Sequence, residues 1–244
     1  MKTLQQSPLL RAIFQQKIDT KKSTKHQEIY ETLGDGFLGG LGSFMFEFKQ
    51  AKNKFKGNMG EWGVSLLLQS FPDTWVIFNN ALIPTNSGSL TEIDHLIIGE
   101  GGVFLVEVKT WKGSFSAYKD QWKRREGNDW LAVSDSPTSQ SIYHQKMFSQ
   151  WITSLMPNLP NGLVVAPVVF PIAKWIGVND CSVPVLRGIP ALLQMIKSSP
   201  DCLTPMQVQV IAQAVENLTL TTNTTPISKP IPKPKPVRRQ NPTI

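Results

Sequence analysis

Val103-Phe-Leu-Val-Glu-Val-Lys109 is the stretch of sequence that decides the fold. This apolar run is interrupted by only one carboxylate and one amine, which is typical of a strand buried on both faces. Gly99-Glu-Gly-Gly102 predicts a tight turn before it. Thr91-Glu-Ile-Asp-His-Leu-Ile-Ile98 predicts the neighbouring strand, because polar and apolar residues alternate at its start. Glu107 and Lys109 are two residues apart, so their side chains should share one face, roughly 6–7 Å apart along the strand.

Other elements follow from hydrophobic periodicity and from capping residues. Ser136 and Pro137 predict the start of a helix, with the serine as cap and the proline at the first helical position. Further strands are expected at Trp75–Asn80, Trp111–Gly113, Tyr118–Trp130 (with turns at Gly113 and Gly127), Leu163–Phe170 and Val183–Leu186. Helices are expected near Leu9–Leu33 and at Gly60–Phe71, Ser136–Leu155, Ile189–Lys197 and Thr204–Leu218.

Charge is unevenly distributed along the 244 residues, whose net charge is +7. Residues 1–56 and 229–244 each carry a net charge of +5, whereas residues 57–228 carry −3. Basic flanks attract polyanions through counterion release, with little sequence preference. The same flanks could equally serve only to keep the protein soluble. The tail is rich in proline and lysine, and this composition predicts an extended, disordered segment over residues 219–244.

Several classes of protein are disfavoured by composition. Cys181 and Cys202 allow one bridge at most and belong to no CxxC or Cys/His cluster, so a zinc site or disulfide scaffold is not expected. We expect two reduced thiols in a cytoplasmic protein. The N-terminus has no apolar stretch typical of a signal peptide, and Gly36–Phe48 is too short to span a bilayer, so stable membrane insertion is not expected.

The candidate chemistry lies on the two central strands. Two neighbouring carboxylates, here Asp94 and Glu107, repel each other unless a cation lies between them. Mg²⁺ accepts carboxylate oxygens, water and substrate phosphate, and Lys109 would then lie beside the ion, oriented toward the attacking water or the phosphate. Such a set suits metal-assisted hydrolysis of a phosphodiester. The alternative is a structural Glu107–Lys109 ion pair on an edge strand, with Asp94 ending a turn.

The wider sequence resembles a known family. The resemblance rests on Lys56-Gly-Asn-Met-Gly-Glu-Trp-Gly63, Glu92-Ile-Asp-His-Leu-Ile-Ile-Gly99, Gly102-Val-Phe-Leu-Val-Glu-Val-Lys-Thr-Trp-Lys-Gly113 and Ser136-Pro-Thr-Ser-Gln140. In this order and spacing, these motifs resemble the NERD (nuclease-related) domain of the PD-(D/E)XK nuclease superfamily, over about residues 54–155. The resemblance implies an α/β fold with a restriction-endonuclease-like core, in which helices flank a central mixed β-sheet. It also implies a site that binds Mg²⁺ or Mn²⁺.

Position by position, the resemblance assigns roles to five residues. Asp94 and Glu107 become metal ligands, Glu61 completes the metal shell from its helix, Lys109 becomes the catalytic lysine, and Gln140 lies near the substrate phosphate. Ser136 stands where many relatives have Asn, and either residue can cap a helix. The implied division is a helical, basic extension (residues 1–53), a nuclease domain (residues 54–218, motif core 57–150) and the tail (residues 219–244).

Smaller signals stay open. His95 should point away from Asp94 and is more often packed or hydrogen-bonded than a ligand. Glu92 shares a face with Asp94 and could support the site. One further set could line a nucleic-acid groove or form a solvated strand face over core tryptophans. Its members are Lys112, Lys119, Lys123, Arg124 and Arg125, interleaved with Trp111, Tyr118 and Trp122.

Two functions of different classes remain. The first is a divalent-metal-dependent nuclease, for which DNA is favoured over RNA as the substrate. The second is a non-cleaving module that uses the same fold and the basic flanks to hold nucleic acid or a partner. Binding by such a module should fall steeply with salt and survive chelation of metal.

Overall fold

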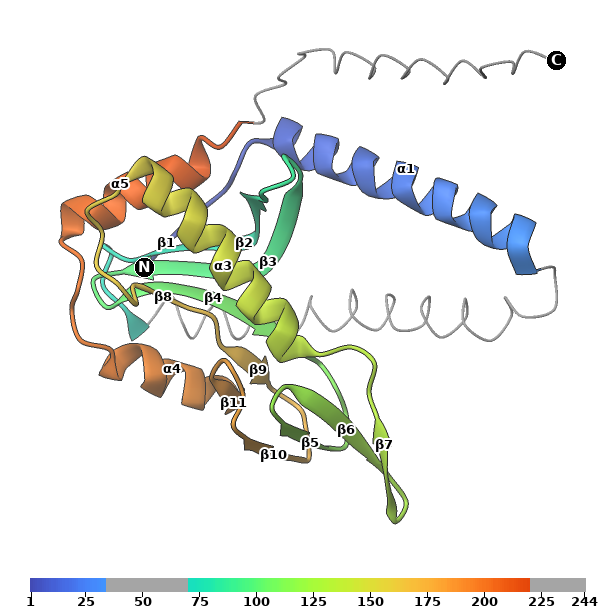
Figure 1. Ribbon diagram of the computed structural model, residues 1–244. Coiled ribbons are helices and arrows are strands. Elements are labelled where there is room, and N and C mark those ends of the chain that lie inside the picture. Colours follow the sequence, from blue (N-terminus) through green and yellow to red (C-terminus); the bar gives the residue numbers. More distant parts are fainter. Residues whose placement is uncertain (34–69, 220–244) are drawn as a thin grey trace, which may run out of the picture.

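A computed structural model describes residues 1–33 and 70–219, with side chains for 1–20 and 70–219 (Figure 1). Nearly all of the predicted helix Gly60–Phe71, with Glu61, lies outside these ranges. So does almost all of the basic tail. The predictions made for these segments stay predictions.

The larger of two sheets is mixed, as predicted for this α/β fold. Its strands follow the order β1-β2-β3-β4-β9-β11, and β8 pairs with β4 beside β9. Pairs β2–β3 and β3–β4 are antiparallel, and the other pairs are parallel. The bounds are β1 (Lys2–Leu4), β2 (Val76–Pro84), β3 (Leu90–Gly99), β4 (Gly102–Val108), β8 (Val164–Val165), β9 (Val168–Phe170) and β11 (Val185–Arg187).

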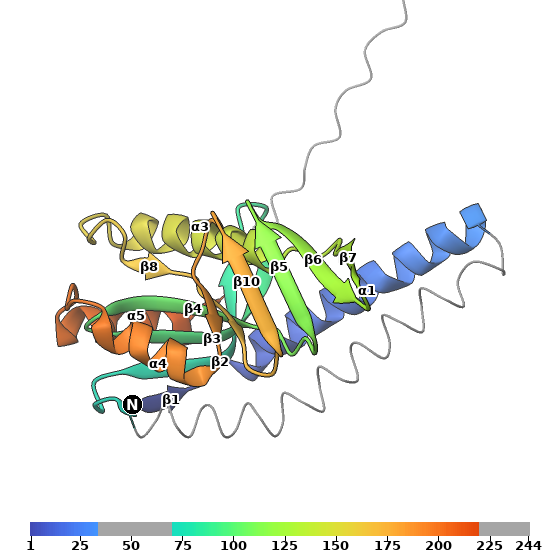
Figure 2. The ribbon, with the colours of Figure 1, turned by 90° about the horizontal axis from the view of Figure 1, so that it is seen from below.

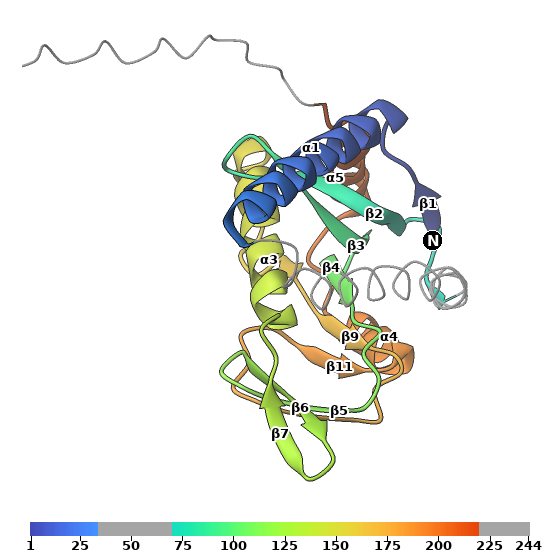
Figure 3. The ribbon, with the colours of Figure 1, turned by 90° about the vertical axis from the view of Figure 1, so that its right-hand side faces the viewer.

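Strand β4 is the centre of this sheet because it has partners on both edges and helices on both faces. Helices α3 (Pro137–Leu155) and α5 (Pro205–Glu216) cover one face, where Leu105 of β4 joins Phe148 and Ile211 in the core. Helix α4 (Ile189–Ser198) covers the other face, where Phe104 packs with Leu192. Figure 3 shows α3 and α4 on opposite sides of the sheet. The uninterrupted burial of Val103–Val106 confirms the prediction made from their apolar run.

A second, four-stranded sheet has the order β10-β5-β6-β7. Its strands are β5 (Ser114–Tyr118), β6 (Gln121–Glu126), β7 (Asp129–Ala132) and β10 (Trp175–Asn179). The sheet lies below the larger one in Figure 1 and in front in Figure 2. Phe115, Ala117 and Trp122 point inward and join the core shared with α3. Since β10 pairs only with β5 and its short sequence contains a glycine, its own pattern did not predict it.

The predicted helix starts are confirmed by their caps. Ser136 Oγ accepts a hydrogen bond from Ser139 N at 3.2 Å, which fixes the start of α3. Thr204 and Gln207 form a capping box at the start of α5. Helix α1 (Pro8–Leu33) covers the predicted Lys-rich segment.

Two predicted strands differ from the structure. Leu163–Phe170 was expected to be one strand, but Ala166-Pro167 divides it into β8 and β9, because proline has no N–H to donate to a ladder. Trp111–Gly113 is not a strand. Trp111 is buried. Gly113 has φ +107°, which lies outside the β region, so the extended backbone is interrupted before β5 begins.

The first residues contribute to the larger sheet. Strand β1 pairs in parallel with β2, and Leu10 of α1 packs on Leu82 and Leu90. Part of the predicted extension 1–53 therefore packs against the domain, while the domain boundary itself stays a prediction. Within the described ranges, none of the helices has the length and apolar character needed to cross a bilayer.

Candidate active site

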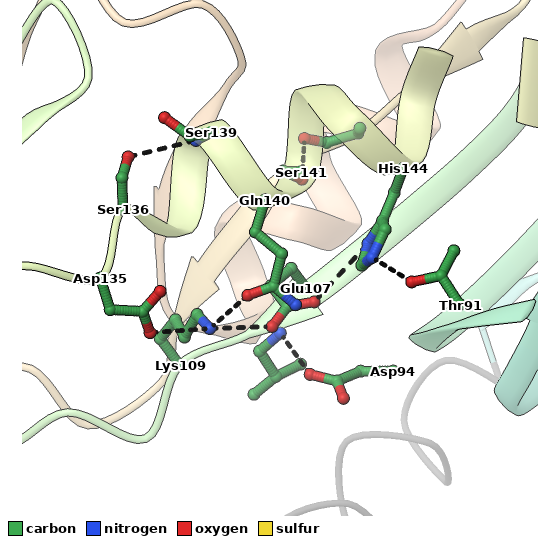
Figure 4. A network of polar contacts seen from close by, with 12 residues as sticks. Thr91, Asp94, Glu107, Lys109, Asp135, Ser136, Ser139, Gln140, Ser141 and His144 are labelled. Atoms are coloured by element: carbon green, nitrogen blue, oxygen red, sulfur yellow. Dashed lines mark hydrogen bonds and ion pairs between the residues drawn. The ribbon is translucent and has the colours of Figure 1, made fainter. Parts of the chain in front are cut away.

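Asp94 lies where strands β3 and β4 separate. Their ladder runs from Gly99 and Gly102 to His95 and Val106, and beyond it β4 pairs with β9 on its other edge. Val108 N, which the ladder no longer reaches, donates to Asp94 Oδ2 at 2.9 Å (Figure 4). This bond satisfies a backbone donor in a region where an unmade hydrogen bond is costly. A carboxylate has about four lone-pair sites, so Asp94 can accept this bond and still bind a cation.

Glu107 and Lys109 are both buried at the end of β4 and their side chains contact each other, as the alternation of β4 predicts. Glu107 is 1% exposed and Lys109 6%, and Lys109 Nζ lies 3.0 Å from Glu107 Oε1. The ion pair considered in the alternative interpretation therefore exists. It lies at the end of the central strand, however, and not on an edge strand. Taking two charges out of water carries a large desolvation cost, so this pair is a poor device for stability alone.

Helix α3 contributes further polar groups from its first turns. Lys109 Nζ donates to Gln140 Oε1 at 2.9 Å, so the structure brings Gln140 to the residues with which it was predicted to act. His144 lies one turn later, with Nδ1 4.0 Å from Glu107 Oε2 and Nε2 3.1 Å from Thr91 Oγ1. Ser141 Oγ donates to Ala166 O at 2.8 Å and fixes α3 against the segment between β8 and β9. Figure 4 shows the side chains of Gln140 and His144 directed toward Lys109 and Glu107.

His144 and Asp135 were missed by the sequence analysis. His144 is 4% exposed and is four residues from Gln140, so helical periodicity could have placed both on one face. Asp135 precedes the cap of α3, and its Oδ2 lies 3.9 Å from Lys109 Nζ. The Asp135 side chain is 57% exposed. It marks the side on which the otherwise buried Lys109 approaches solvent, and no sequence pattern indicated this contact.

The donor set suits a hard divalent cation. Mg²⁺ is commonly held by one or two carboxylates, with water and substrate phosphate completing its shell. Asp94 and Glu107 supply two buried carboxylates on neighbouring strands. In the part of the chain that the structure describes, no group of three His, Cys, Asp or Glu residues is placed to hold a metal. The third predicted ligand, Glu61, lies outside that part.

The structure also shows the surroundings of His95, Glu92 and the two tryptophans Trp111 and Trp122. His95 Nδ1 lies 2.7 Å from Asn79 Oδ1, so His95 is a hydrogen-bonded strand residue. Glu92 forms an ion pair at 3.7 Å with Arg11 of α1, a contact that connects it to the helix. Trp111 and Trp122 are buried in the core, which excludes them as stacking surfaces for bases. Both interpretations of the basic residues, a nucleic-acid groove and a solvated strand face, stay predictions.

Comparison with known protein families gives a match over the middle of the chain. Residues 56–171 match the family model of NERD, the nuclease-related domain. This range holds β2 to β9, and with them Asp94, Glu107, Lys109, Gln140 and His144.

Two curated proteins share a segment with the chain. An uncharacterized protein of Bacillus anthracis is 39% identical over 61 residues, which are 25% of this chain and 29% of that protein. A probable kinase, PglW of Streptomyces coelicolor, is 32% identical over 62 residues, which are 25% of this chain and 4% of that protein. The chain therefore spans well under two thirds of these relatives. No solved structure matches it.

Proposed function

We propose that this protein, whose residues 56–171 match the nuclease-related domain, is a divalent-metal-dependent nuclease that hydrolyses phosphodiester bonds of DNA. The observation that carries the proposal is the buried amine of Lys109. It contacts Glu107 and Gln140, and Asp94 accepts a hydrogen bond from the backbone of Val108, the residue between Glu107 and Lys109. A structural role alone gives no reason to bury a lysine and two carboxylates at the point where two strands separate.

The residues of the site would divide the work as follows. Asp94 and Glu107, completed by Glu61, would hold Mg²⁺ or Mn²⁺, which supplies Lewis-acid activation of the phosphate and of an attacking water. Lys109 would orient the attacking water or stabilise charge on the phosphate with its ammonium group. Gln140 uses its Oε1 to position Lys109, and its Nε2 carries the hydrogens that can bind a phosphate oxygen.

Glu107 and His144 illustrate how the site is held before substrate arrives. His144 lies against the Glu107 oxygen opposite the one that contacts Lys109. Contacts on both oxygens restrict rotation of the carboxylate. Such preorganisation reduces the rearrangement needed when charge develops in the transition state.

The experiment is cleavage of end-labelled DNA by the purified full chain with Mg²⁺, with Mn²⁺ or with excess EDTA. Cleavage should require the metal and should fall by at least about 10²-fold in Asp94→Asn and in Lys109→Met, since each removes a group acting on the reacting centre. Cutting that continues at the wild-type rate in both variants would come from a contaminant, and the proposal would fail.

A second candidate function is a module that holds nucleic acid without cleaving it. It is favoured by the basic flanks, since residues 1–56 and 229–244 each carry a net charge of +5. Binding would then survive EDTA, decline steeply between 50 and 200 mM salt as is usual for about six phosphate contacts, and weaken when residues 227–244 are removed. Metal-dependent cleavage that is lost in the two variants above would exclude this alternative.

A further inference from the structure

The outer face of the four-stranded sheet is open to solvent. Its inner face is closed by Phe115 and Trp122, which point into the core. Strand alternation therefore turns Ser114 and Ser116 of β5, and Lys123 and Arg125 of β6, outward. A four-stranded sheet with one open face offers a surface wide enough for an extended chain of bases.

Two exposed tryptophans meet above this face. Trp130 of β7 is 38% exposed and Trp175 of β10 is 46% exposed, and their ring centroids lie 5.9 Å apart with an interplanar angle of 57°. They come from the two edges of the sheet. Trp175 is paired with Ser114 and Trp130 with Arg125. The two rings therefore converge over the middle strands, a region where Ser114 leaves room.

The ring of Trp175 packs over a glycine of its own strand. A Cβ built on Gly177 would lie 2.0 Å from Cη2 of the Trp175 ring, so the ring lies over the backbone of Gly177. Strand β10 thus supplies both the ring and the glycine backbone on which the ring lies. A large aromatic side chain placed in one orientation and still half-exposed is suited to stacking on a ligand, because little side-chain entropy remains to be lost on binding.

The charge of this face is of one sign. Lys123 and Arg125 point outward between the tryptophans, and the outward positions of the four described strands carry no acidic residue. Arg125 Nε donates to Gly127 O at 3.2 Å, which orients its guanidinium along β6. Cations that hold phosphates and rings that stack on bases are the two elements of sequence-tolerant binding to single strands.

We propose that this outer face, defined by Trp130, Trp175, Lys123 and Arg125, binds single-stranded nucleic acid and presents it to the site at Lys109. The proposal rests on the proposed function, which makes nucleic acid the ligand. A duplex stacks its bases on each other and has none to offer these rings, so the face selects single strands or locally opened ones.

The connections of the chain place this face beside the site. Asp135, which contacts Lys109, is three residues beyond the end of β7, a span of at most about 11 Å. At its other end the sheet begins at Ser114, five residues after Lys109. A bound strand of several nucleotides is long enough to reach from the tryptophans to the exposed side of Lys109.

The test is binding of fluorescein-labelled 20-nucleotide oligodeoxythymidine to the full chain in EDTA, followed by anisotropy. EDTA separates binding from cleavage. Trp130→Ala and Trp175→Ala should each weaken binding by about tenfold, the usual cost of removing one stacking ring. Trp175→Phe should retain part of the affinity. Gly177→Ala keeps Trp175 but places a methyl group where its ring lies, so this variant should also weaken binding.

Matched controls separate this face from general basic attraction. Arg125→Ala should weaken binding and lower the slope of log affinity against log salt concentration by about one. Arg187 is an exposed arginine of the other sheet, and Arg187→Ala should change both the affinity and this slope much less. Unchanged melting temperatures would show that the variants fold. In the tryptophan variants, the affinity for a blunt duplex of 20 base pairs should fall less than the affinity for the single strand.

The outcomes distinguish this inference from the proposed function. Equal binding of the single strand by wild type and both tryptophan variants would overturn the inference even if the wild type cuts DNA. Equal loss of single strand and duplex would overturn the selectivity for single strands. Tryptophan-dependent binding without any metal-dependent cutting would support the inference while the nuclease proposal fails.

Discussion

Lys109 Nζ donates to Gln140 Oε1 at 2.9 Å, which joins the end of β4 to the second turn of α3. The two residues are 31 positions apart in the chain. This bond, together with the ion pair to Glu107, orients the one buried lysine among the described residues. It therefore connects the core of the sheet to the helix that covers the site.

Replacing Gln140 should affect activity more than stability. Gln140→Ala removes one hydrogen bond to a charged group, which costs about 1.5 kcal/mol of unfolding free energy. Because Lys109 then loses part of its orientation, DNA cleavage should fall by about 10²-fold. Urea unfolding and a cleavage time course measure the two effects. A cleavage rate equal to that of wild type would remove Gln140 from the site.

The two parts of Asp94's role can be separated with an isosteric variant. Asp94→Asn keeps an oxygen that can accept the Val108 N–H, so the fold should be retained, but it removes the charge that attracts a cation. Mn²⁺ binding, followed by calorimetry, should weaken by at least about tenfold. Asp94→Ala should in addition cost about 2 kcal/mol, because Val108 N loses its partner. Unaltered Mn²⁺ affinity in Asp94→Asn would show that the ion binds elsewhere.

The buried ion pair should show strong coupling. Lys109→Met leaves the buried Glu107 carboxylate without its ion-pair partner, and Glu107→Leu does the same to the buried Lys109 ammonium. Each variant should therefore lose about 3 kcal/mol of unfolding free energy. The double variant removes both charges. Its cost should be smaller than the sum of the single costs by more than about 1 kcal/mol. Guanidinium unfolding of the four proteins gives the cycle, and additive costs would mean that the charges do not interact.

Asp120 should give stability that depends on pH. Burial opposes its charged form, but hydrogen bonds from Ser182 and Thr138 outweigh burial and hold the pKa of Asp120 below its ordinary value of 3.8. A lowered pKa in the folded state means that the stabilisation is complete above about pH 3.8 and is lost as the pH falls through the lowered value.

The variant Asp120→Asn measures this contribution. Asn tolerates the φ of +64° at this position, so the turn between β5 and β6 should be kept. The variant should be less stable than wild type by about 1 kcal/mol at pH 7, since the partly exposed carboxylate accepts bonds from Ser182 N and Oγ. The difference should shrink below pH 3.8. Asp201→Asn, an exposed carboxylate, is the control, and a difference independent of pH would refute the assignment.

Local patterns predicted most of the helices and strands among the described residues. The apolar run of β4, the glycine turn before it and the cap of α3 depend on neighbours in the chain, so the sequence alone identified them. Elements defined by distant partners were not identified in this way. Strand β10 exists because it pairs with β5, and β1 because it pairs with β2.

For the candidate site, alternation along one strand was sufficient to predict that Glu107 and Lys109 share a face, and the neighbouring strand supplied Asp94. The resemblance in motifs added Glu61 and Gln140. Only the tertiary structure decided that Lys109 is buried, that His144 lies against Glu107, and that Trp111 and Trp122 are core residues while other tryptophans are exposed. The physical reason is that periodicity assigns a side chain to a face of its own element. Whether that face meets water or another element depends on packing between segments that are far apart in the chain.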